Sequence, residues 1–583
     1  MARWTHLPKA DQRVSLRGAP VAVMHRAWLS CLAALALLLA PRAGSQTASS
    51  EVSTAFASPH AADRESALDR LIATQDSRPE LLPVLARMLD DPDLAVAGKA
   101  ATALALPGAE AWPTLAQLLA DGSPQQRWGA TVALSHTRAD IRPFLPALTQ
   151  QLAEADSRLV SASLAALASL EADAAPARPA LEAVLTHQDA EIRRAALVTL
   201  GRIGPAAAEG VPAIAPFLHD PSAELRLAAA EAMQRIRPPA PIPTSQLAAH
   251  LDWLREEVPA LMCQHHVPGV SIAVVQQGEL RWAQGFGVAD ARTGRVVTAE
   301  TVFEACSMSK PIVALLAVQL VQEGRLDLDR PLVEYLGRDY LPDQPAHRRI
   351  TARMALTHRT GLENWRPGYD EMGGPLALMF PPGSEYTYSG EGILFLQRAL
   401  EAITGQPLER LAQEWLFAPL GLARTSFVWS ETLEADLASG HREDGSFKER
   451  TRYRKGNGAY SLYTTPIEYA RLMLSLVRPG LLRERAFTPE SIERLLAREL
   501  RLDDGDALMR PGLARAVATY RALGFKLDVT AEGDIAWHTG ANSSGFRTLG
   551  QINPAKGSGL VVFTNGDGGS RVHEAIVARI GNL

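Results

Sequence analysis

Cysteine is scarce in this 583-residue chain, which contains only three. Cys31 lies in an apolar run near the N-terminus, so that Cys263 and Cys306 are the thiols left for a folded domain. Two thiols this far apart in sequence make neither a disulfide framework nor a cysteine metal cluster. His, Cys and Asp also do not recur at the spacing of metal ligands, so we expect no metal and no other cofactor.

The chain also lacks a large excess of charge of either sign. The formal net charge is −5, and no block of like charges interrupts the sequence. Proteins that bind nucleic acids need a basic surface, so we expect no nucleic-acid partner. A hydrophobic content of 47% with 21% charged residues describes a soluble globular protein. At this length we expect two or more domains.

Long hydrophobic runs are absent except for Ala27–Ala40. This run is short for a membrane span and suits the apolar core of a signal peptide, with the small residues Ala43–Ser45 at the cleavage site. We therefore assign residues 1–45 to a signal peptide whose over-long leader leaves Met24 as an alternative start. The predicted protein is exported, periplasmic or secreted, and has no stable membrane span after cleavage; an uncleaved signal would anchor it in the membrane.

A repeat follows the predicted linker at residues 46–59. Prolines recur at intervals of 30, 33, 33 and 33 residues, at Pro83, Pro113, Pro146, Pro179 and Pro212. Each unit of residues 60–237 predicts a proline-started apolar helix, a turn with Asp, and an alanine-rich second helix. Such pairs bury their apolar faces only by stacking, which predicts a curved α-solenoid.

The repeated region resembles HEAT repeats of the short variety. The resemblance leaves two roles open. The repeats either bind a protein partner on their concave surface or serve as a spacer or stabilising arm. A proline-rich linker is predicted at residues 238–245, and a second domain at residues 246–583.

The second domain begins and ends with strand patterns. Leu247–His266 predicts an amphipathic helix, and Val270–Val275 with Leu280–Val288 predicts a hairpin. Further strands are expected at residues 519–528, 534–538, 545–553 and 559–564, followed by a closing helix at Ser570–Ile580. Strands from both ends with helices between them predict an α+β fold.

The candidate catalytic residues begin with Ser307 and Lys310, which are three residues apart at the start of a long apolar helical pattern. This spacing places both side chains on one face of a helix. A serine hydroxyl needs a base to become a nucleophile, and a desolvated lysine is able to act as that base. Cys306 is an alternative nucleophile, but it lies outside this register.

Two later stretches supply the remaining groups. Tyr388 lies on a loop rich in turn residues, where a phenol is able to relay a proton between nucleophile and leaving group. His538-Thr539-Gly540-Ala541 ends a predicted strand. The glycine would let substrate approach the backbone, so that the Ala541 amide could donate to an oxyanion.

In this order the three stretches resemble the serine β-lactamase and penicillin-binding-protein superfamily, most closely its class C branch. The supporting segments are His266–Val275, Glu323–Pro331, Ala355–Leu362 and Ala459–Thr465. The resemblance implies an antiparallel sheet flanked by helices, with a helical subdomain.

The resemblance also implies a role for each candidate residue. Ser307 would form the acyl-enzyme, Lys310 would be its base, and Tyr388 would correspond to the tyrosine of Y-x-N. His538-Thr539-Gly540 would stand at K-T-G, and the N–H groups of Ser307 and Ala541 would form the oxyanion hole.

The sequence departs from the family pattern at two of these positions. Gly390 replaces the asparagine of Y-x-N, and His538 replaces a permanent lysine cation. If His538 bound a substrate carboxylate as imidazolium, affinity would weaken above about pH 6.5. Both changes favour ester or amide hydrolysis, including D-amino-acid peptides, over β-lactams. The alternatives are an inactive binding scaffold and a true β-lactamase or DD-carboxypeptidase; the expected ligand is a small molecule or peptide.

Overall fold

The computed structural model describes residues 14–15, 55–341, 343–366, 375–502, 516–581 and 583. The chain divides into two compact units, Gly18–Pro238 and a larger unit that contains Pro239–Leu583 together with Met1–Arg17. The predicted signal peptide falls outside the described residues, except that Val14–Ser15 forms strand β1 beside β6 (Glu385–Tyr386). No helix in the described ranges has both the length and the apolar character to cross a membrane.

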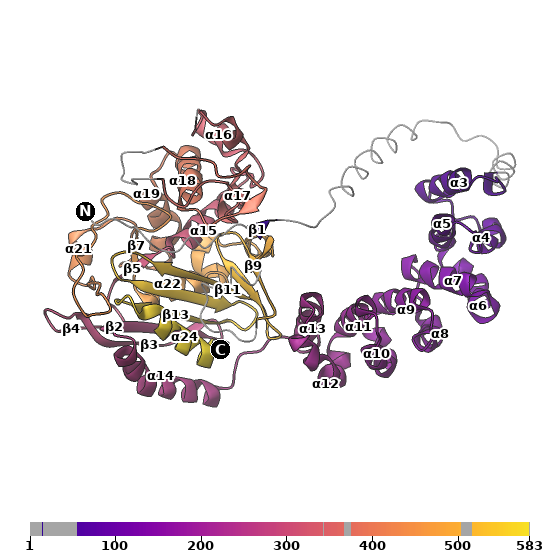
Figure 1. Cartoon of the computed structure of the whole chain (residues 1–583), viewed down its shortest axis with the longest axis horizontal. Coiled ribbons are helices and arrows are strands. Elements are labelled where there is room, and N and C mark those ends of the chain that lie inside the picture. Colours follow the sequence, from indigo (N-terminus) through magenta and orange to yellow (C-terminus); the bar gives the residue numbers. More distant parts are fainter. Residues whose placement is uncertain (1–13, 16–54, 342, 367–374, 503–515, 582) are drawn as a thin grey trace. The chain divides into compact units, whose positions relative to one another are not determined.

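The smaller unit consists of helix pairs connected by short turns (Figure 1). Its helices are α3 (Ala61–Ala73), α4 (Leu82–Met88), α5 (Leu94–Leu104), α6 (Trp112–Asp121), α7 (Pro124–His136), α8 (Leu145–Gln151), α9 (Ser157–Ser169), α10 (Arg178–Val184), α11 (Ala190–Ile203), α12 (Val211–Ile214) and α13 (Ala223–Ile236). Short 3₁₀ turns precede or follow them at Pro79–Leu81, Gly108–Ala111, Arg142–Phe144, Glu171–Ala177, Gly204–Gly210 and Ala215–His219.

The predicted start signals explain these helices. The first helix of each pair carries proline in its first turn, where the missing N–H is not needed. The second helix of each pair is capped by a side-chain oxygen that accepts a hydrogen bond from a backbone N–H in the first turn. The capping residues are Asp93, Ser123, Asp156, Asp189 and Ser222. One continuous apolar core joins the pairs, as a stacked repeat requires. Phe56 of the predicted linker is buried in that core, so the packed unit begins before residue 60.

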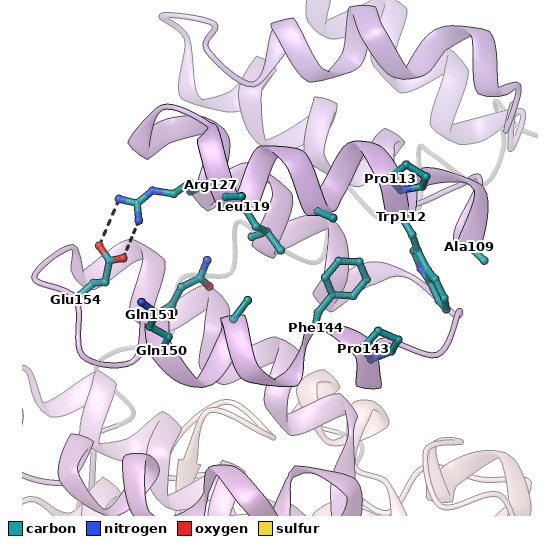
Figure 2. Close-up of a pocket in the computed structure, with 13 residues that line it drawn as sticks. Ala109, Trp112, Pro113, Leu119, Arg127, Pro143, Phe144, Gln150, Gln151 and Glu154 are labelled. Atoms are coloured by element: carbon teal, nitrogen blue, oxygen red, sulfur yellow. Dashed lines mark hydrogen bonds and ion pairs between the residues drawn. The ribbon is translucent and has the colours of Figure 1, made fainter.

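A cavity of about 860 Å³ opens between α6, α7 and α8 of this unit (Figure 2). One end is apolar, where the rings of Trp112 and Phe144 meet edge to face at 6.0 Å. The other end carries the ion pair of Arg127 with Glu154, whose nearest atoms are 2.7 Å apart.

The larger unit is built on a nine-stranded sheet in the order β4-β3-β2-β13-β12-β11-β10-β9-β8. Every neighbouring pair is antiparallel. The strands are β2 (Gly269–Gln276), β3 (Glu279–Asp290), β4 (Arg295–Val296), β8 (Leu500–Leu502), β9 (Ala518–Arg521), β10 (Lys526–Val529), β11 (Ile535–Ala541), β12 (Arg547–Asn553) and β13 (Ser558–Thr564). Two short strands, β5 (Phe303–Cys306) and β7 (Leu462–Thr464), pair separately.

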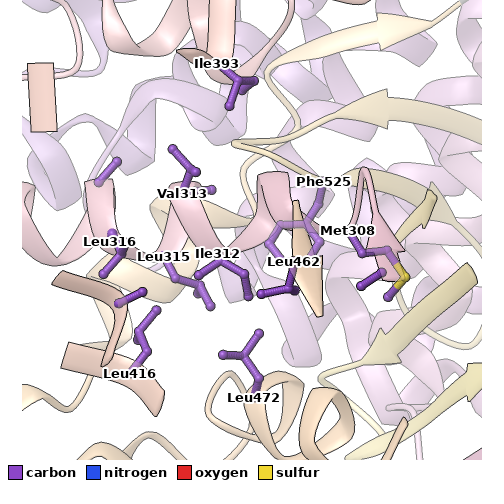
Figure 3. Close-up of a cluster of buried hydrophobic side chains, with 14 of the residues drawn as sticks. Met308, Ile312, Val313, Leu315, Leu316, Ile393, Leu416, Leu462, Leu472 and Phe525 are labelled. Carbon is purple, nitrogen blue, oxygen red and sulfur yellow. The ribbon is translucent and has the colours of Figure 1, made fainter. Parts of the chain in front are cut away.

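Helices cover both faces of the sheet. Alternate residues of β2 and β13 pack into two different cores, as the period of two of a strand requires. One core lies against α14 (Thr244–Gln264) and α24 (Gly569–Ile580), and the other surrounds the almost fully buried α15 (Ser309–Gln322) (Figure 3). The remaining helices are α16 (Leu332–Leu336), α17 (Ala352–Leu356), α18 (Gly390–Thr404), α19 (Leu408–Ala412), α20 (Ala418–Leu420), α21 (Glu431–Glu434), α22 (Pro466–Leu474) and α23 (Pro489–Leu495), with turns at Pro345–Arg349, Gln413–Phe417 and Pro479–Arg485.

The predicted fold class, helical repeats followed by an α+β domain, is confirmed. Two boundaries differ in detail from the prediction. Residues 519–528 form two strands, since Gly524 takes a φ of 75° and Ala522 N–H donates to Phe525 O across a turn. The predicted linker at 238–245 ends early, because α14 already begins at Thr244.

Candidate active site

Ser307 lies in the turn between β5 and α15, where it is half-buried and lines a cavity of about 960 Å³. The preceding Cys306 has a φ of 55°, a left-handed conformation that is strained for a residue with a side chain. The Cys306 side chain is fully buried, and burial raises the pKa of its thiol well above the ordinary value. This burial argues against the cysteine alternative and leaves Ser307 as the nucleophile candidate.

Lys310 directs its amine at Ser307. Its Nζ lies 3.0 Å from Ser307 Oγ and donates to the Ala459 carbonyl at 2.7 Å. The side chain is completely buried. Burial, and then the positive charge of Arg521, lowers the pKa of Lys310 well below its ordinary value. A neutral amine at this position is able to accept the hydroxyl proton of Ser307.

Tyr388 lies in the loop between β6 and α18. Its ring centroid is 4.7 Å from Lys310 Nζ, and Tyr388 lines the same cavity as Ser307. Burial raises the pKa of Tyr388 to about 12, against the opposing effect of the nearby Ser307. The phenol therefore keeps its proton at neutral pH, which assigns the role of base to Lys310 and that of proton donor to Tyr388.

His358 supports Tyr388, although the sequence analysis assigned it no role. The two rings lie 4.4 Å apart, and His358 Nδ1 accepts the Ser389 N–H at 3.1 Å. His358 is buried, and burial followed by the charge of Arg521 lowers its pKa well below the ordinary value. A neutral imidazole thus holds the Tyr388 loop in place. The sequence signal that could have pointed to His358 is its segment, Ala355–Leu362, which is one of those that carry the family resemblance.

Strand β11 carries the third stretch to the same cavity, which Ser307, His538, Thr539 and Ala541 all line. Gly540 is required by the close approach of β11 to β5. A Cβ at this position would lie 2.4 Å from the Ala305 carbonyl oxygen. The oxyanion role of the Ser307 and Ala541 amides stays a prediction, now with both residues in one cavity.

The surroundings of His538 disfavour its imidazolium form. Its Nδ1 is 2.6 Å from the Thr539 carbonyl oxygen. Burial, and then the charges of Lys310 and Arg521, lowers the pKa of His538 well below the ordinary value. The imidazolium role, with its loss of affinity above about pH 6.5, stays a prediction, and the lowered pKa of His538 favours the neutral ring.

Gly390 is the first residue of α18, and its N–H donates to Asn364 Oδ1 at 2.9 Å. A Cβ on Gly390 would lie 2.3 Å from Cη2 of Trp365. The indole of Trp365 also lies edge to face with Tyr460, at 5.3 Å between centroids, and Tyr460 contacts Tyr453 at the same distance. An aromatic wall of Trp365, Tyr453 and Tyr460 thus lines the cavity beside position 390.

A buried carboxyl group supports this wall from behind. Glu304 Oε2 accepts hydrogen bonds from the Tyr453 hydroxyl at 3.2 Å and from Ser544 Oγ at 2.8 Å. Asn542 Nδ2 donates to the same Tyr453 hydroxyl at 3.1 Å. Burial raises the pKa of Glu304. The carboxyl group ties the Tyr453 loop to the turn after β11.

Sequence reasoning missed Arg521, which lies at the end of β9 and lines the cavity with Lys526 of β10. Both are more than nine-tenths buried. Within the described ranges, no group of three or more His, Cys, Asp and Glu side chains is placed to hold a metal ion.

A strained turn thus presents a serine to a buried lysine beside β11, an arrangement that is able to carry out acyl transfer. A family model for β-lactamases matches residues 251–582, more than half of the chain, and the chain belongs to this family of serine hydrolases. A model for HEAT repeats matches residues 145–234 and 177–252.

Curated relatives of the chain have several activities. It is 30% identical over 203 residues to penicillin-binding protein 4 of Amycolatopsis lactamdurans, covering 33% of this chain and 53% of that one. It is 30% identical over 215 residues to esterase EstB of Burkholderia gladioli, covering 32% of this chain and 53% of the esterase. It is also 30% identical over 194 residues to a D-aminopeptidase of Brucella anthropi, covering 30% of this chain and 36% of the peptidase. The chain thus spans about half or less of the length of these relatives.

Among solved structures, the chain is similar to an octameric penicillin-binding protein homologue from Pyrococcus abyssi. The identity is 20% and the TM-score 0.48, over 56% of this chain and 76% of the other. It is also similar to a D-alanine carboxypeptidase from Burkholderia cenocepacia, with 23% identity and a TM-score of 0.45 over 58% and 100% of the two chains.

Proposed function

We propose that this protein hydrolyses an ester or amide bond through an acyl-enzyme on Ser307. The observation that carries the proposal is the 3.0 Å contact between Ser307 Oγ and the buried Lys310 Nζ. A lysine whose pKa is lowered by burial takes the serine proton as Oγ attacks the carbonyl carbon. The amides of Ser307 and Ala541 would stabilise the oxyanion.

Tyr388 completes the cycle as the proton donor. Its phenol lies in the same cavity as Ser307 and protonates the leaving group as the acyl-enzyme forms. Protonated Lys310 then returns the serine proton to the Tyr388 phenolate, so that both residues are ready for the second step. Water attacks the acyl-enzyme while Lys310 accepts a proton from that water, and the proton passes to Ser307 Oγ as the acid product leaves. The names of the relatives include an esterase and a D-aminopeptidase. Trp365 against Gly390 and the neutral His538 weigh against a β-lactam substrate.

A serine-directed fluorophosphonate probe tests the nucleophile. We expect the probe to label the full chain at Ser307, and Ser307→Ala to abolish both the labelling and the turnover of short p-nitrophenyl esters. Ser543→Ala is the matched control, since Ser543 lines the same cavity away from the lysine contact. A wild-type protein that is neither labelled nor active would favour the alternative of an inactive binding scaffold.

Export and the function of the repeats are further parts of the proposal. The apolar run Ala27–Ala40 supports export to the periplasm or medium, which N-terminal sequencing of the mature protein would test by finding a start near Gln46. The repeats would act as an interaction or positioning arm, and the cavity lined by Trp112 and Phe144 is a candidate contact for a protein partner.

A further inference from the structure

We propose that the cavity between α6, α7 and α8 binds a proline-rich segment of a partner protein in the polyproline II conformation. This inference rests on the proposed role of the repeats as an interaction arm and names the partner. It concerns the smaller unit alone and does not depend on the chemistry at Ser307.

The two aromatic rings of this cavity depart from the repeat pattern. Trp112 is half-buried and meets the buried Phe144 edge to face. At the repeat position of Trp112 the other units carry Leu82, Leu145, Arg178 and Val211, and at that of Phe144 they carry Leu81, Ala111, Ala177 and Gly210. Those units join the same continuous core without an aromatic ring at either position. Stacking of the repeats therefore does not require the rings, which points to a ligand.

Small side chains keep the space beside the rings open. Ala116 and Ala120 of α6 line the cavity together with Ala147 of α8. Figure 2 shows Pro113 and Pro143 beside the two rings, so that this end offers flat apolar surfaces. A cavity of about 860 Å³ has the size of pockets that enclose a drug-sized ligand. It is therefore large enough for a few residues of an extended chain.

The polar end of the cavity carries no net charge. Arg127 donates to both carboxylate oxygens of Glu154, at 2.7 and 3.3 Å. Within the described lining these are the only two ionisable side chains. Because their charges cancel, the cavity favours an uncharged ligand over an anion or a cation.

Two side chains that line the cavity carry N–H groups without a partner. Trp112 Nε1 is buried and forms no hydrogen bond with any described residue. Gln151 is 5% exposed, and its Oε1 lies 3.1 Å from Thr131 Oγ1 and 2.7 Å from Ser163 Oγ. Its Nε2 has no partner among the described residues. Since an unpaired buried donor is costly, a ligand that supplies carbonyl oxygens would be stabilised at both ends of the cavity.

These donors discriminate between peptide conformations. The carbonyl groups inside a helix are already hydrogen-bonded. A strand presents N–H groups as well as carbonyl groups, and its N–H groups would need acceptors that apolar walls lack. A polyproline II segment leaves its carbonyl groups unpaired, and its prolines have no N–H to satisfy. Aromatic-lined grooves bind such segments at a low cost in chain entropy. The rings, the neutral polar end and the unpaired donors together fit a proline-rich segment.

Fluorescence polarisation with the full chain tests the site. Fluorescein-labelled decaproline should bind, and a glycine–serine peptide and an alanine-rich helical peptide of equal length should bind more weakly. Phe144→Ala introduces the residue that two other units carry, and should weaken decaproline binding about 5- to 30-fold. Trp112→Phe keeps a ring and removes the N–H, so the affinity should fall about 3- to 10-fold. Gln117→Ala is the matched control, since Gln117 is exposed on α6 outside the cavity lining.

Competition on the wild type provides a second measurement that does not depend on the folding of a variant. Unlabelled decaproline should displace the labelled peptide, and added salt should leave the affinity nearly unchanged because the cavity carries no net charge. Equal binding of the three peptides, a steep loss of affinity with salt, or an unchanged affinity in Phe144→Ala would overturn the site. Tighter binding of the helical peptide would also overturn it, because the cavity would then take a helix. None of these readouts uses ester turnover or the labelling of Ser307, so failure of the proposed hydrolase would be seen separately.

Discussion

The indole of Trp365 fills the space that a side chain on residue 390 would need, since a Cβ on Gly390 would lie 2.3 Å from Trp365 Cη2. The glycine that replaces the family asparagine is therefore part of a packed aromatic wall. The two positions depend on each other, because residue 390 cannot gain a side chain while the indole stays in place.

This contact predicts the outcome of restoring the asparagine. Gly390→Asn should force Trp365 out of place, destabilise the larger unit by about 1–3 kcal/mol, and lower ester turnover without creating β-lactamase activity. Trp365→Ala with Gly390→Asn should recover most of the lost stability. Thermal unfolding and hydrolysis of a chromogenic cephalosporin measure both effects. A stable single variant that hydrolyses the cephalosporin would show that the indole does not control this position.

The different environments of Lys310 and Tyr388 predict the pH profile. For a neutral ester, kcat/KM should rise with pH as Lys310 loses its proton, at a pH well below the ordinary lysine value. Tyr388, with its pKa of about 12, should cause no decline below strongly alkaline pH. Lys310→Arg places a cation there that is unable to lose its proton, and should reduce kcat/KM by about 10²–10⁴-fold.

The stopped-flow profile of acylation checks this assignment, with Ser543→Ala as the control that should follow the wild-type curve. If Lys310→Arg retained full activity, or if activity fell through neutral pH as the pH rose, Lys310 would not be the base.

Buried neutral histidines predict a loss of stability in acid. His573 on α24 is 2% exposed, and burial lowers its pKa to about 3. Below about pH 6.5 the unfolded chain binds a proton at this residue that the folded chain does not bind. The free energy of unfolding should therefore fall by about 1.4 kcal/mol per pH unit between pH 6.5 and the folded pKa, and is fully retained above pH 6.5.

Denaturant unfolding at pH 7.5 and 5.5 measures this slope. His573→Leu should reduce the pH dependence of the unfolding free energy by the contribution of one histidine. The pH dependence that is left should come from His358 and His538, because burial is also the main cause of their lowered pKa values. An unchanged slope in His573→Leu would mean that the residue is protonated in the folded protein.

The local signals in the sequence were sufficient for much of this structure. Proline spacing gave the helix pairs, and the strand patterns at both ends of the domain gave a sheet with helices between. The spacing of Ser307 and Lys310 was enough to place the nucleophile beside its base, because side chains three residues apart at the start of a helix lie next to each other.

What remained hidden depends on contacts between distant segments. Arg521 enters the site only through the register of β9 against β10, and its own segment reads as an ordinary strand. The charge state of His538 depends on burial, which its sequence does not reveal. Trp365 contacts Gly390 although the two residues are 25 positions apart in the sequence, and no local pattern marks that contact.

The repeat unit supplies the last prediction. Gly201 of α11 faces α13 so closely that a Cβ would lie 2.8 Å from Ala232 Cα, a backbone atom that does not yield as a side chain would. Gly201→Leu should separate the two helices and destabilise the repeat unit by about 1–3 kcal/mol. Gly98→Ala is the matched control, because its nearest neighbour would be Trp128 Cη2 at 3.9 Å and alanine favours the helix.

Unfolding of the repeat unit and ester turnover should be measured on the same preparations. If the repeats are an accessory arm, Gly201→Leu should lower the unfolding temperature of the repeat unit and leave kcat/KM for a small ester at the wild-type value. The reason is that, among the described residues, only those of the larger unit line the cavity around Ser307. A parallel fall in turnover, absent from Gly98→Ala, would instead make the repeats part of the catalytic unit.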